Sequence, residues 1–442
     1  RLTTLSLAAR MRTAHLHRHA AALFAKAHAE AKESESTEDI SSEDEEEEET
    51  SASLPPLCVS PQEQHTHKED KTQEEQEEKS KSKKRASVLL LYTGGTIGMR
   101  KDPKTGAYFP DSEYLAERLG QGLLPRDAAM PDLSYSAYTP PLDSSDMNSA
   151  HWSAIAKAVG EEYDEYDGFV VITGTDTMAY TASALSFALE NLGKPVVVTG
   201  SQIPISVVRS DGVANLVDSC LVAAHGRAAE LAECVVVFDG HVLRANRTTK
   251  LKAWGISAFK SFSYPPLGEG GVRFVTFPDR TRRPAAAPFR CRPHFSPDVA
   301  LFSMYPGAER FAPAALAALL AQRVRGIVLE AFGTGNAPTE KALMATLASL
   351  CHEHGVVVCV VSRCPHGAVS LGSYSGGYCL AQAGCTSCHD MTVEAAFTKL
   401  SWLLGDPALP VARVRELMEQ DLRGEVTQGL FLHPNRSLRV LV

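Results

Sequence analysis

The sequence predicts an α/β protein with two domains: a larger N-terminal one built on a doubly wound parallel sheet and a smaller C-terminal Rossmann-like one. Short apolar, β-branched runs alternate with helical stretches, which is typical of parallel sheets covered by helices. A Pro- and Arg-rich passage at 278–293 interrupts this alternation once. With 442 residues, 44% of them hydrophobic, the chain is long enough to bury two cores.

The first 85 residues differ in composition from the rest. Residues 1–32 are rich in Arg, His and Ala and carry no acid before Glu30, which permits a mitochondrial transit peptide or an exposed amphipathic helix. Residues 33–78 contain eighteen acids and two lysines, so the remainder of the chain is slightly basic despite the net charge of -9. Because such a composition buries too little apolar surface to offset ordering entropy, we expect 1–85 to be a disordered acidic extension.

The N-terminal domain is expected at 86–280. It begins at Ser87, where SVLLLYT predicts a buried strand that leads into the glycine turn TGGTIG at 93–98. Further buried strands are expected at 168–173, 195–199 and 233–238, and helices at 178–191 and 211–225.

A linker at 281–298 is expected to lead into the C-terminal domain at 299–430, followed by a tail at 431–442. The C-terminal strands are predicted at 325–332 and 355–362, and its last helices at 392–404 and 411–421.

Charge and hydropathy exclude several classes of partner. No Lys/Arg stripe suggests a nucleic-acid footprint. No run of eighteen apolar residues and no cleavable leader is present, so we expect no membrane contact and a cytoplasmic location. The ten cysteines are irregularly placed, which favours reduced thiols over a disulfide scaffold.

Two glycine-containing loops directly follow two of the predicted strands, GGT at 94–96 and GTDT at 174–177. Neither is specific alone, because glycine turns are common and these lack the lysine of a phosphate loop and the spacing of a dinucleotide fingerprint. Ligands of doubly wound sheets bind beyond the carboxyl ends of the strands, so the two loops could face one another across one crevice.

A third element, RANRTTK at 244–250, could bring Lys250 to the same edge of the sheet. Loop lysines are usually solvated. Beside Asp176 and a threonine, however, Lys250 would form a proton-handling group, because a threonine hydroxyl is a weak nucleophile until a neighbour accepts its proton.

Together these motifs resemble the asparaginase family. TGGTIG, GTDTMAYTAS, VVVTGSQIPI, RTTK and DMTVEAAFTKLSWLLG match it in order, from about Val88 to about Gln428. The resemblance is strongest to the cytosolic type I branch, which includes animal enzymes whose asparaginase domain precedes ankyrin repeats. It implies the asparaginase fold, hydrolysis of L-asparagine to L-aspartate and ammonia, no cofactor or metal, and a homodimer or homotetramer.

The resemblance also implies catalytic roles. The family's nucleophile falls on Thr96, and a second group falls on Thr175, Asp176 and Lys250. A mobile-loop tyrosine that closes over substrate and helps to activate the nucleophile corresponds to Tyr108. Thr96 would form an acyl-enzyme, and water activated by Thr175 and Lys250 would release aspartate. Which threonine attacks first stays open, because Asp176 favours a charged Lys250 whereas a general base must be neutral.

Substrate binding is implied at five further positions. The carboxylate and hydroxyls of Asp143, Ser144 and Ser145 suit the α-amino and α-carboxylate ends of asparagine. In the family's oligomers the second domain completes the pocket of a neighbouring subunit, and the matching residues are Asn336 and Tyr374. Alternatively, Asn336 and Tyr374 are surface turn residues without a role in substrate binding.

Some bacterial type I enzymes have a second asparagine site that gives cooperativity, and the matching positions here are Thr249 and Cys364. They permit an allosteric site, although a buried thiol beside a glycine turn is the ordinary interpretation of Cys364. The chain departs from the family at Thr173, where HGTDT usually has histidine.

Other interpretations have weaker support. CTSCH at 385–389 matches haem or zinc patterns, but no second ligand cluster accompanies it. A glutaminase or the amidase subunit of tRNA-dependent amidotransferases would share the fold, yet that subunit normally carries an N-terminal barrel, whereas 1–85 is low-complexity. A catalytically silent scaffold would not need the four catalytic side chains together. No G-x-S-x-G elbow supports lysophospholipase activity.

Overall fold

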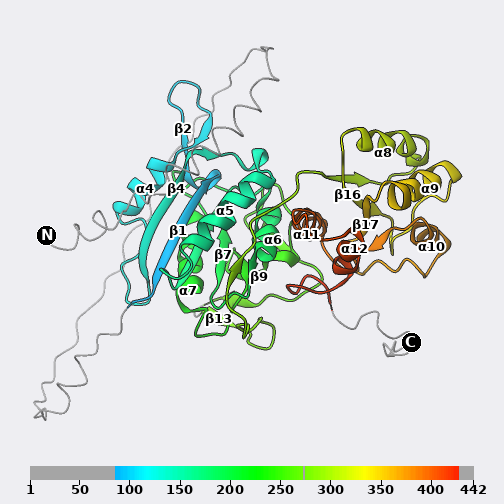
Figure 1. Ribbon diagram of the computed structural model, residues 1–442. Helices are drawn as coiled ribbons and strands as arrows, with labels where there is room; N and C mark the ends of the chain where they lie inside the picture. The colour runs from blue at the N-terminus through cyan, green and yellow to red at the C-terminus, as the bar shows by residue number, and fades with distance from the viewer. Residues whose placement is uncertain (1–84, 272–273, 428–442) are drawn as a thin grey trace, which may run out of the picture. The chain divides into compact units, whose positions relative to one another are not determined.

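The structure is a computed structural model that describes residues 85–271 and 274–427. Apart from Arg85, the expected disordered extension lies outside the described residues, and so do the candidate transit segment at 1–32 and the tail at 431–442. The predicted fold class is confirmed, because a large, mainly parallel sheet with helices is followed by a smaller α/β domain (Figure 1).

An eight-stranded sheet lies at the centre of the N-terminal domain, in the order β13-β12-β9-β8-β7-β5-β1-β4. Five neighbouring strands run parallel, namely β4, β1, β5, β7 and β8. The sheet is extended by β9, β12 and β13, each of which pairs antiparallel with its neighbour. The bounds are β1 Ser87–Gly94, β4 Asp132–Leu142, β5 Gly168–Ile172, β7 Val196–Thr199, β8 Cys234–Phe238, β9 His241–Arg244, β12 Gly268–Gly270 and β13 Phe274–Thr276.

Helices cover both faces of this sheet, which explains why its central strands are continuous apolar runs. Leu89 and Leu91 of β1 belong to a core shared with α5 and α6, and Leu90 and Tyr92 belong to a core shared with α4 and α7. The bounds are α4 Ser112–Gly120, α5 Ser149–Glu161, α6 Met178–Ala188 and α7 Gly212–His225.

The C-terminal sheet has four parallel strands in the order β15-β16-β17-β18. One face packs with α11 and α12 and the other with α8, α9 and α10 (Figure 1). The bounds are β15 Val299–Ser303, β16 Gly326–Ala331, β17 Val357–Ser362, β18 Thr386–Ser387, α8 Ala312–Ala321, α9 Lys341–Ala348, α10 Ser375–Gln382, α11 Val393–Leu404 and α12 Val411–Glu419.

The segment after α12 is fixed by buried charges. Lys399 Nζ lies 2.6 Å from a carboxylate oxygen of Glu425, and both side chains are fully buried. Arg247 pairs with Asp390 at 2.9 Å and donates to the carbonyl oxygen of Gly424 at 2.7 Å. Because a buried charge that loses its partner is strongly destabilising, these contacts set the path of the segment.

Regular structure also occurs where the sequence predicted only a connection. Within 278–293, the short strand β14 (Arg290–Cys291) pairs with β6 (Leu189–Glu190). The pairing uses backbone groups alone, so no hydrophobic pattern indicates it.

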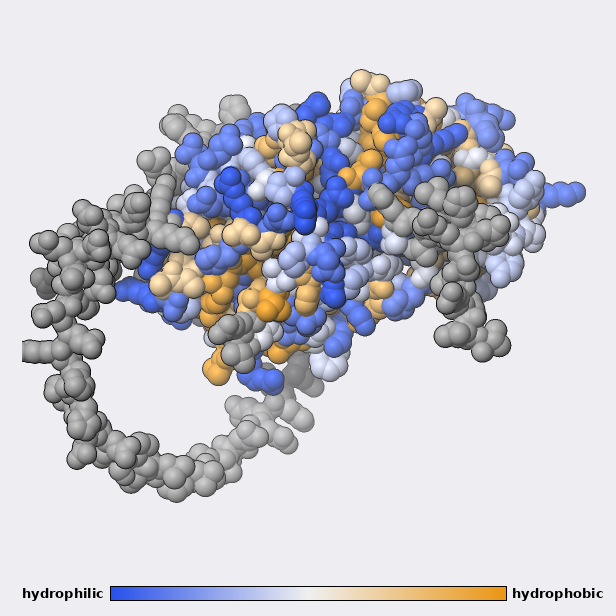
Figure 2. Space-filling view, turned by 90° about the horizontal axis from the view of Figure 1, so that it is seen from below, coloured by the Kyte–Doolittle hydropathy of each residue, from blue (hydrophilic) through white to orange (hydrophobic). Residues whose placement is uncertain are grey.

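None of the helices in the described part of the chain is both long and apolar enough to cross a membrane. On the face shown in Figure 2, groups of hydrophobic residues are separated by hydrophilic ones.

Candidate active site

Three loops meet at the carboxyl edge of the parallel strands, and their backbones are in contact. A Cβ atom on Gly95 would lie 2.2 Å from the backbone nitrogen of Gly174, and one on Gly94 would lie 2.0 Å from the carbonyl oxygen of Leu142. Both positions also have positive φ angles, 135° for Gly94 and 90° for Gly95. Only glycine fits here, and the loops after β1, β4 and β5 converge because these three strands are neighbours in the sheet.

Thr96 begins the short helix η3 (Thr96–Gly98) and is half-buried. Within the described part of the chain, no hydrogen bond of its hydroxyl is found. Thr175 follows Gly174 in the contacting loop, so the two threonines lie next to the same backbone contact. The two loops therefore lie against each other at one edge of the sheet.

Thr175 lies at the centre of a hydrogen-bond chain. Lys250 Nζ donates to Thr175 Oγ1 at 2.8 Å and to Asp176 Oδ1 at 2.6 Å. Thr175 Oγ1 in turn donates to Gln202 Oε1 at 2.9 Å. Lys250, the last residue of β10 (Thr248–Lys250), keeps only 15% of its side chain exposed, whereas Asp176 keeps 70%.

Gln202 was not predicted as a site residue. Its amide nitrogen donates to the carbonyl oxygens of Ala253 at 3.1 Å and Gly255 at 3.2 Å, which turns its amide oxygen toward Thr175. The signal was available in TGSQIP, which follows the strand at 195–199, but a glutamine offers no titratable group to draw attention.

The loop after β4 carries the predicted substrate-binding group. Asp143 caps the short helix η4 (Ser144–Asp146), and its Oδ1 accepts from the backbone N–H of Ser145 at 3.0 Å and from the Ser145 hydroxyl at 2.8 Å. Ser144 is 5% exposed and packs against Gly174, and its carbonyl oxygen accepts from the Thr177 hydroxyl at 2.7 Å. This loop therefore adjoins the Thr175 loop.

Tyr108 lies on a hairpin formed by β2 (Met99–Lys101) and β3 (Tyr108–Pro110), and its side chain is 45% exposed. The backbone N–H of Asp111 donates to the carbonyl oxygen of Gly98 at 3.1 Å, which anchors the hairpin to the turn that contains Thr96. The hairpin is thus next to the nucleophile candidate, with its tyrosine facing solvent.

Comparison with known proteins identifies the chain. The family description "Asparaginase, N-terminal" matches residues 87–280, and "Glutaminase/Asparaginase C-terminal domain" matches residues 298–418. The chain belongs to the asparaginase family. The predicted family, fold and hydrolase class are confirmed.

Several relatives cover most of the chain. L-asparaginase 1 of Escherichia coli is 41% identical over 346 residues, which are 78% of this chain and 99% of the relative. The 60 kDa lysophospholipase of Mus musculus is 40% identical over 361 residues, 77% of this chain and 62% of the relative. A glutamyl-tRNA(Gln) amidotransferase component of Pyrococcus abyssi is 35% identical over 357 residues, 77% of this chain and 76% of the relative.

Among solved structures, L-asparaginase I from Vibrio cholerae superposes with a TM-score of 0.69 at 40% identity, covering 78% of this chain and 99% of that one. Thr173, where this chain departs from the asparaginase pattern, is 1% exposed, and its backbone N–H donates to the carbonyl oxygen of Thr199 at 2.9 Å. The position thus lies directly after β5, at the start of the loop that carries Thr175.

The asparaginase residues expected from the second domain lie apart from this cluster. Asn336 Oδ1 accepts from the backbone N–H of Gly377 at 3.3 Å, in the helix α10 that Tyr374 precedes. Tyr374 is 62% exposed. In the described residues, no hydrogen bond or ion pair connects either side chain to Thr96, Thr175 or Lys250.

The two candidate allosteric residues of this chain line one cavity of about 340 Å³. Thr249 Oγ1 donates to Glu394 Oε1 at 2.6 Å, and Cys364 lies on the exposed rim. The interpretation of Cys364 as an ordinary buried thiol is wrong, because the residue is exposed. Burial raises the pKa of Glu394, although the Thr249 hydroxyl opposes the shift.

The CTSCH motif does not gather its side chains into one ligand set. The Cys385 thiol forms a hydrogen bond with the free thiol of Cys351, and the Cys388 thiol forms one with the free thiol of Cys359, so the two cysteines of the motif have different neighbours. No group of three or more His, Cys, Asp or Glu side chains that could hold a metal was found within 85–271 and 274–427.

Proposed function

We propose that the chain hydrolyses the side-chain amide of L-asparagine to L-aspartate and ammonia. The observation that carries this proposal is Lys250 Nζ within 2.8 Å of Thr175 and 2.6 Å of Asp176, beside the loop that presents Thr96. The L-asparaginases among the relatives support the same reaction.

In the proposed mechanism Thr96 attacks the amide carbon, the nitrogen takes up a proton and leaves as ammonia, and water then cleaves the ester. Thr96 has a hydroxyl without a hydrogen bond in the described part of the chain. The Thr175 hydroxyl is held on both sides, by Lys250 and by Gln202. A threonine nucleophile needs a neighbour that accepts its proton, and we give this role to Tyr108 on the adjacent hairpin. The Thr175 hydroxyl, which is held in one orientation, suits the group that positions water, so we assign the attack to Thr96.

The oxyanion of the reaction has favourable surroundings. Helix α6 begins at Met178, directly after the Thr175 loop, and its first turn carries no acidic residue. A helix N-terminus stabilises nearby negative charge, and its free N–H groups can donate to an oxyanion. We place the oxyanion at the backbone N–H groups around Thr175.

The α-amino end of asparagine is assigned to Asp143. Its Oδ1 is engaged by Ser145, which leaves Oδ2 without a partner among the described residues. A carboxylate held in one orientation at an exposed loop is suited to bind an ammonium group.

Ammonia release from L-asparagine and L-glutamine tests the proposal. We expect activity on asparagine that Thr96→Ala and Thr175→Ala each reduce by orders of magnitude, with both variants folded by circular dichroism. Stronger activity on glutamine would favour the glutaminase alternative. Binding of L-aspartate without release of ammonia from either amide would favour a silent scaffold.

We also propose that Asn336 and Tyr374 act in the site of a neighbouring subunit. Next to Lys250, Leu251 is 52% exposed and Trp254 is 92% exposed, so apolar surface is available beside the site for a second copy. Inactive Thr96→Ala and Asn336→Ala chains that are mixed and refolded together should regain activity, because some of the mixed sites contain an intact Thr96 from one chain and an intact Asn336 from the other. Absence of complementation would place both residues in one subunit's site or in none.

The cavity at Thr249 and Cys364 is proposed as a second site for asparagine. Thr249 contacts Glu394 while the adjacent Lys250 contacts Thr175, since successive side chains of a strand point in opposite directions. A ligand that moves Thr249 would therefore move Lys250. A sigmoidal rate curve that Thr249→Ala makes hyperbolic would support this, and a hyperbolic wild-type curve would contradict it.

A cytoplasmic location, with mitochondrial import through 1–32 as the alternative, is likewise a proposal, and a fluorescent fusion to the full chain distinguishes the two. The domain limits 86–280 and 299–430 predict protease cleavage within 281–298.

A further inference from the structure

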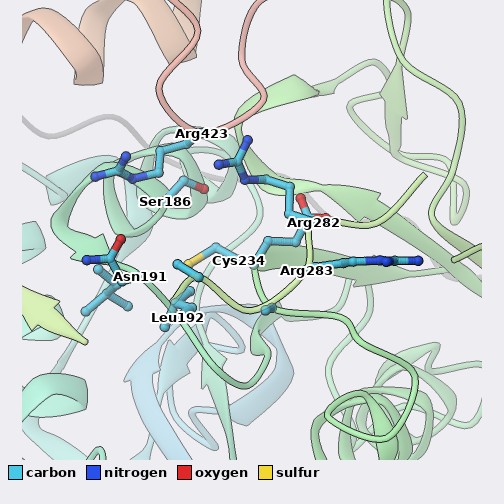
Figure 3. A pocket seen from close by; sticks show the side chains of 11 residues that line it. Ser186, Asn191, Leu192, Cys234, Arg282, Arg283 and Arg423 are labelled. Carbon is cyan, nitrogen blue, oxygen red and sulfur yellow. The ribbon is translucent and has the colours of Figure 1, made fainter. Parts of the chain in front are cut away.

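A second cavity, of about 60 Å³, lies at the edge of the large sheet opposite the catalytic loops. Figure 3 shows the side chains that line it. Its wall includes Cys234, the first residue of β8, whereas the catalytic loops follow the last residues of parallel strands. The rest of the wall comes from the end of α6, from the connection after β13 and from the segment after α12. The cavity is therefore separate from the proposed reaction.

The charged side chains that line this cavity are three arginines and one glutamate. The carboxylate of Glu233 is already engaged: Arg244 Nε donates to it at 2.6 Å, and the backbone N–H of Arg282 donates to it at 2.8 Å. Arg244 thus neutralises Glu233 from outside the cavity. Of the three arginines, Arg423 pairs with Glu190 at 2.9 Å and Arg283 with Glu230 at 3.1 Å, so Arg282 is the one that has no ion pair among the described residues.

One of these arginines has an unused buried donor. Arg423 pairs with Glu190 at 2.9 Å, yet its Nε is buried without a hydrogen-bond partner among the described residues, which is costly. Arg282 is half-buried and donates to the carbonyl oxygen of Leu422 at 3.5 Å, the limit of a hydrogen bond. Burial raises the pKa of Asp421, and the positive charge of Arg282 opposes that shift.

The two guanidinium groups also act on each other. Burial lowers the pKa of Arg423, and the positive charge of Arg282 lowers it further against the opposing effect of Glu190. Figure 3 shows Arg282 and Arg423 with their guanidinium groups on the same side of Cys234, while Arg283 extends away from them. A ligand between the first two would relieve their repulsion if it were anionic.

We infer that this cavity binds a small tetrahedral oxyanion, either inorganic phosphate or the phosphate group of a phosphomonoester. One water needs roughly 10–15 Å³ of such volume, so about 60 Å³ accommodates roughly four to six water-sized positions, which suits the five heavy atoms of phosphate. Arginine forks bind such oxygens through paired, charge-assisted hydrogen bonds.

Binding would join parts of the chain that are far apart in sequence. Arg282 belongs to the connection between the two family domains, and Arg423 to the segment that Lys399 and Arg247 hold in place. An anion bound by both arginines stabilises the folded chain by mass action, so unfolding temperature rises with its concentration.

The test is calorimetric titration of the full chain with phosphate, together with thermal unfolding, at an ionic strength kept constant with sodium chloride. We expect one saturable site per chain and a rise in unfolding temperature. Arg282→Gln should weaken binding by roughly tenfold to a hundredfold, because a charge-assisted hydrogen bond is lost. Arg283→Gln is the matched control, since that side chain is 74% exposed, and it should change affinity by no more than about twofold.

Titration with glycerol 3-phosphate and AMP separates the two sources of phosphate. Tighter binding of either than of phosphate, lost in Arg282→Gln, identifies a phosphomonoester, and weaker binding identifies free phosphate. If Arg282→Gln does not fold, Arg282→Lys, which retains the charge and loses the fork, should still weaken binding. Absence of saturable binding, or equal binding by wild type and both Arg282 variants, overturns the inference.

Discussion

Replacing Gln202 by methionine removes the acceptor that orients Thr175 while nearly preserving the length of the side chain. Gln202 Oε1 accepts from Thr175 at 2.9 Å, and Nε2 donates to the carbonyl oxygens of Ala253 and Gly255 at 3.1 and 3.2 Å. Methionine forms none of these bonds. The Thr175 hydroxyl then rotates freely and keeps only its contact with Lys250.

The expected loss follows from the number of bonds that act on the reaction. One net hydrogen bond contributes about 0.5–1.5 kcal/mol. If this orientation is required in the transition state, kcat for asparagine falls roughly 2- to 12-fold, since about 1.4 kcal/mol corresponds to tenfold. KM should change less than kcat, because Gln202 is not among the side chains assigned to the α-amino and α-carboxylate ends.

Steady-state ammonia release at saturating asparagine measures this effect. Gln121→Met is the matched control, because Gln121 bonds only to exposed side chains at the end of α4 and should leave kcat unchanged. A folded Gln202→Met variant whose kcat stays within twofold of the wild type would refute the role of Gln202.

The remaining predictions concern stability and close packing. Lys399→Met leaves Glu425 buried without its partner and should lower the free energy of unfolding in urea at pH 7 by about 3–5 kcal/mol. Burial alone would raise the pKa of Glu425, but the Lys399 ammonium lowers it to about 2. The pair therefore stabilises the fold fully above about pH 4.5 and loses this effect as the pH falls toward 2. A difference in the free energy of unfolding between wild type and variant that stays constant on acid titration would contradict this. Gly95→Ala should abolish ammonia release, because its Cβ would lie 2.2 Å from a backbone nitrogen, whereas Gly120→Ala, with nothing within 4 Å, should be fully active. Burial raises the pKa of Glu394, so its ionised form destabilises the fold at pH values above the pKa that this carboxyl has in the unfolded chain. Glu394→Gln should therefore raise the unfolding temperature at pH 7 and leave it unchanged near pH 3.5. An equal effect at both pH values would speak against this.

The strands that could be predicted from sequence are those buried on both faces. GFVVI at 168–172 is fully buried, so its apolar run is contiguous and easily found. The strand 268–270 reads GEG and exists only because its backbone pairs with β9 and β13. Strand β4 contains Pro140 and Pro141, which argue against a strand, but it lies at the sheet edge, where proline is tolerated.

The candidate site was predictable where residue type and loop position agree. The hydroxyls of Thr96 and Thr175 follow buried strands, and both were predicted. Gln202 was missed although its motif was recognised, because its role depends on an approach to Thr175 from 27 residues away. The contribution proposed for Asn336 and Tyr374 would depend on a second copy of the chain, which no pattern within one chain specifies.

The backbone contact between Gly95 and Gly174 constrains how this enzyme could change its substrate. Where the two loops touch, main chain meets main chain, so neither glycine offers a side chain whose replacement would reshape the site. Variation in the accepted amide must then arise around this contact, in the loop with Ser144, in the hairpin that carries Tyr108 and on the exposed surface near Trp254. Libraries aimed at new selectivity should therefore vary those segments and leave the two glycines intact.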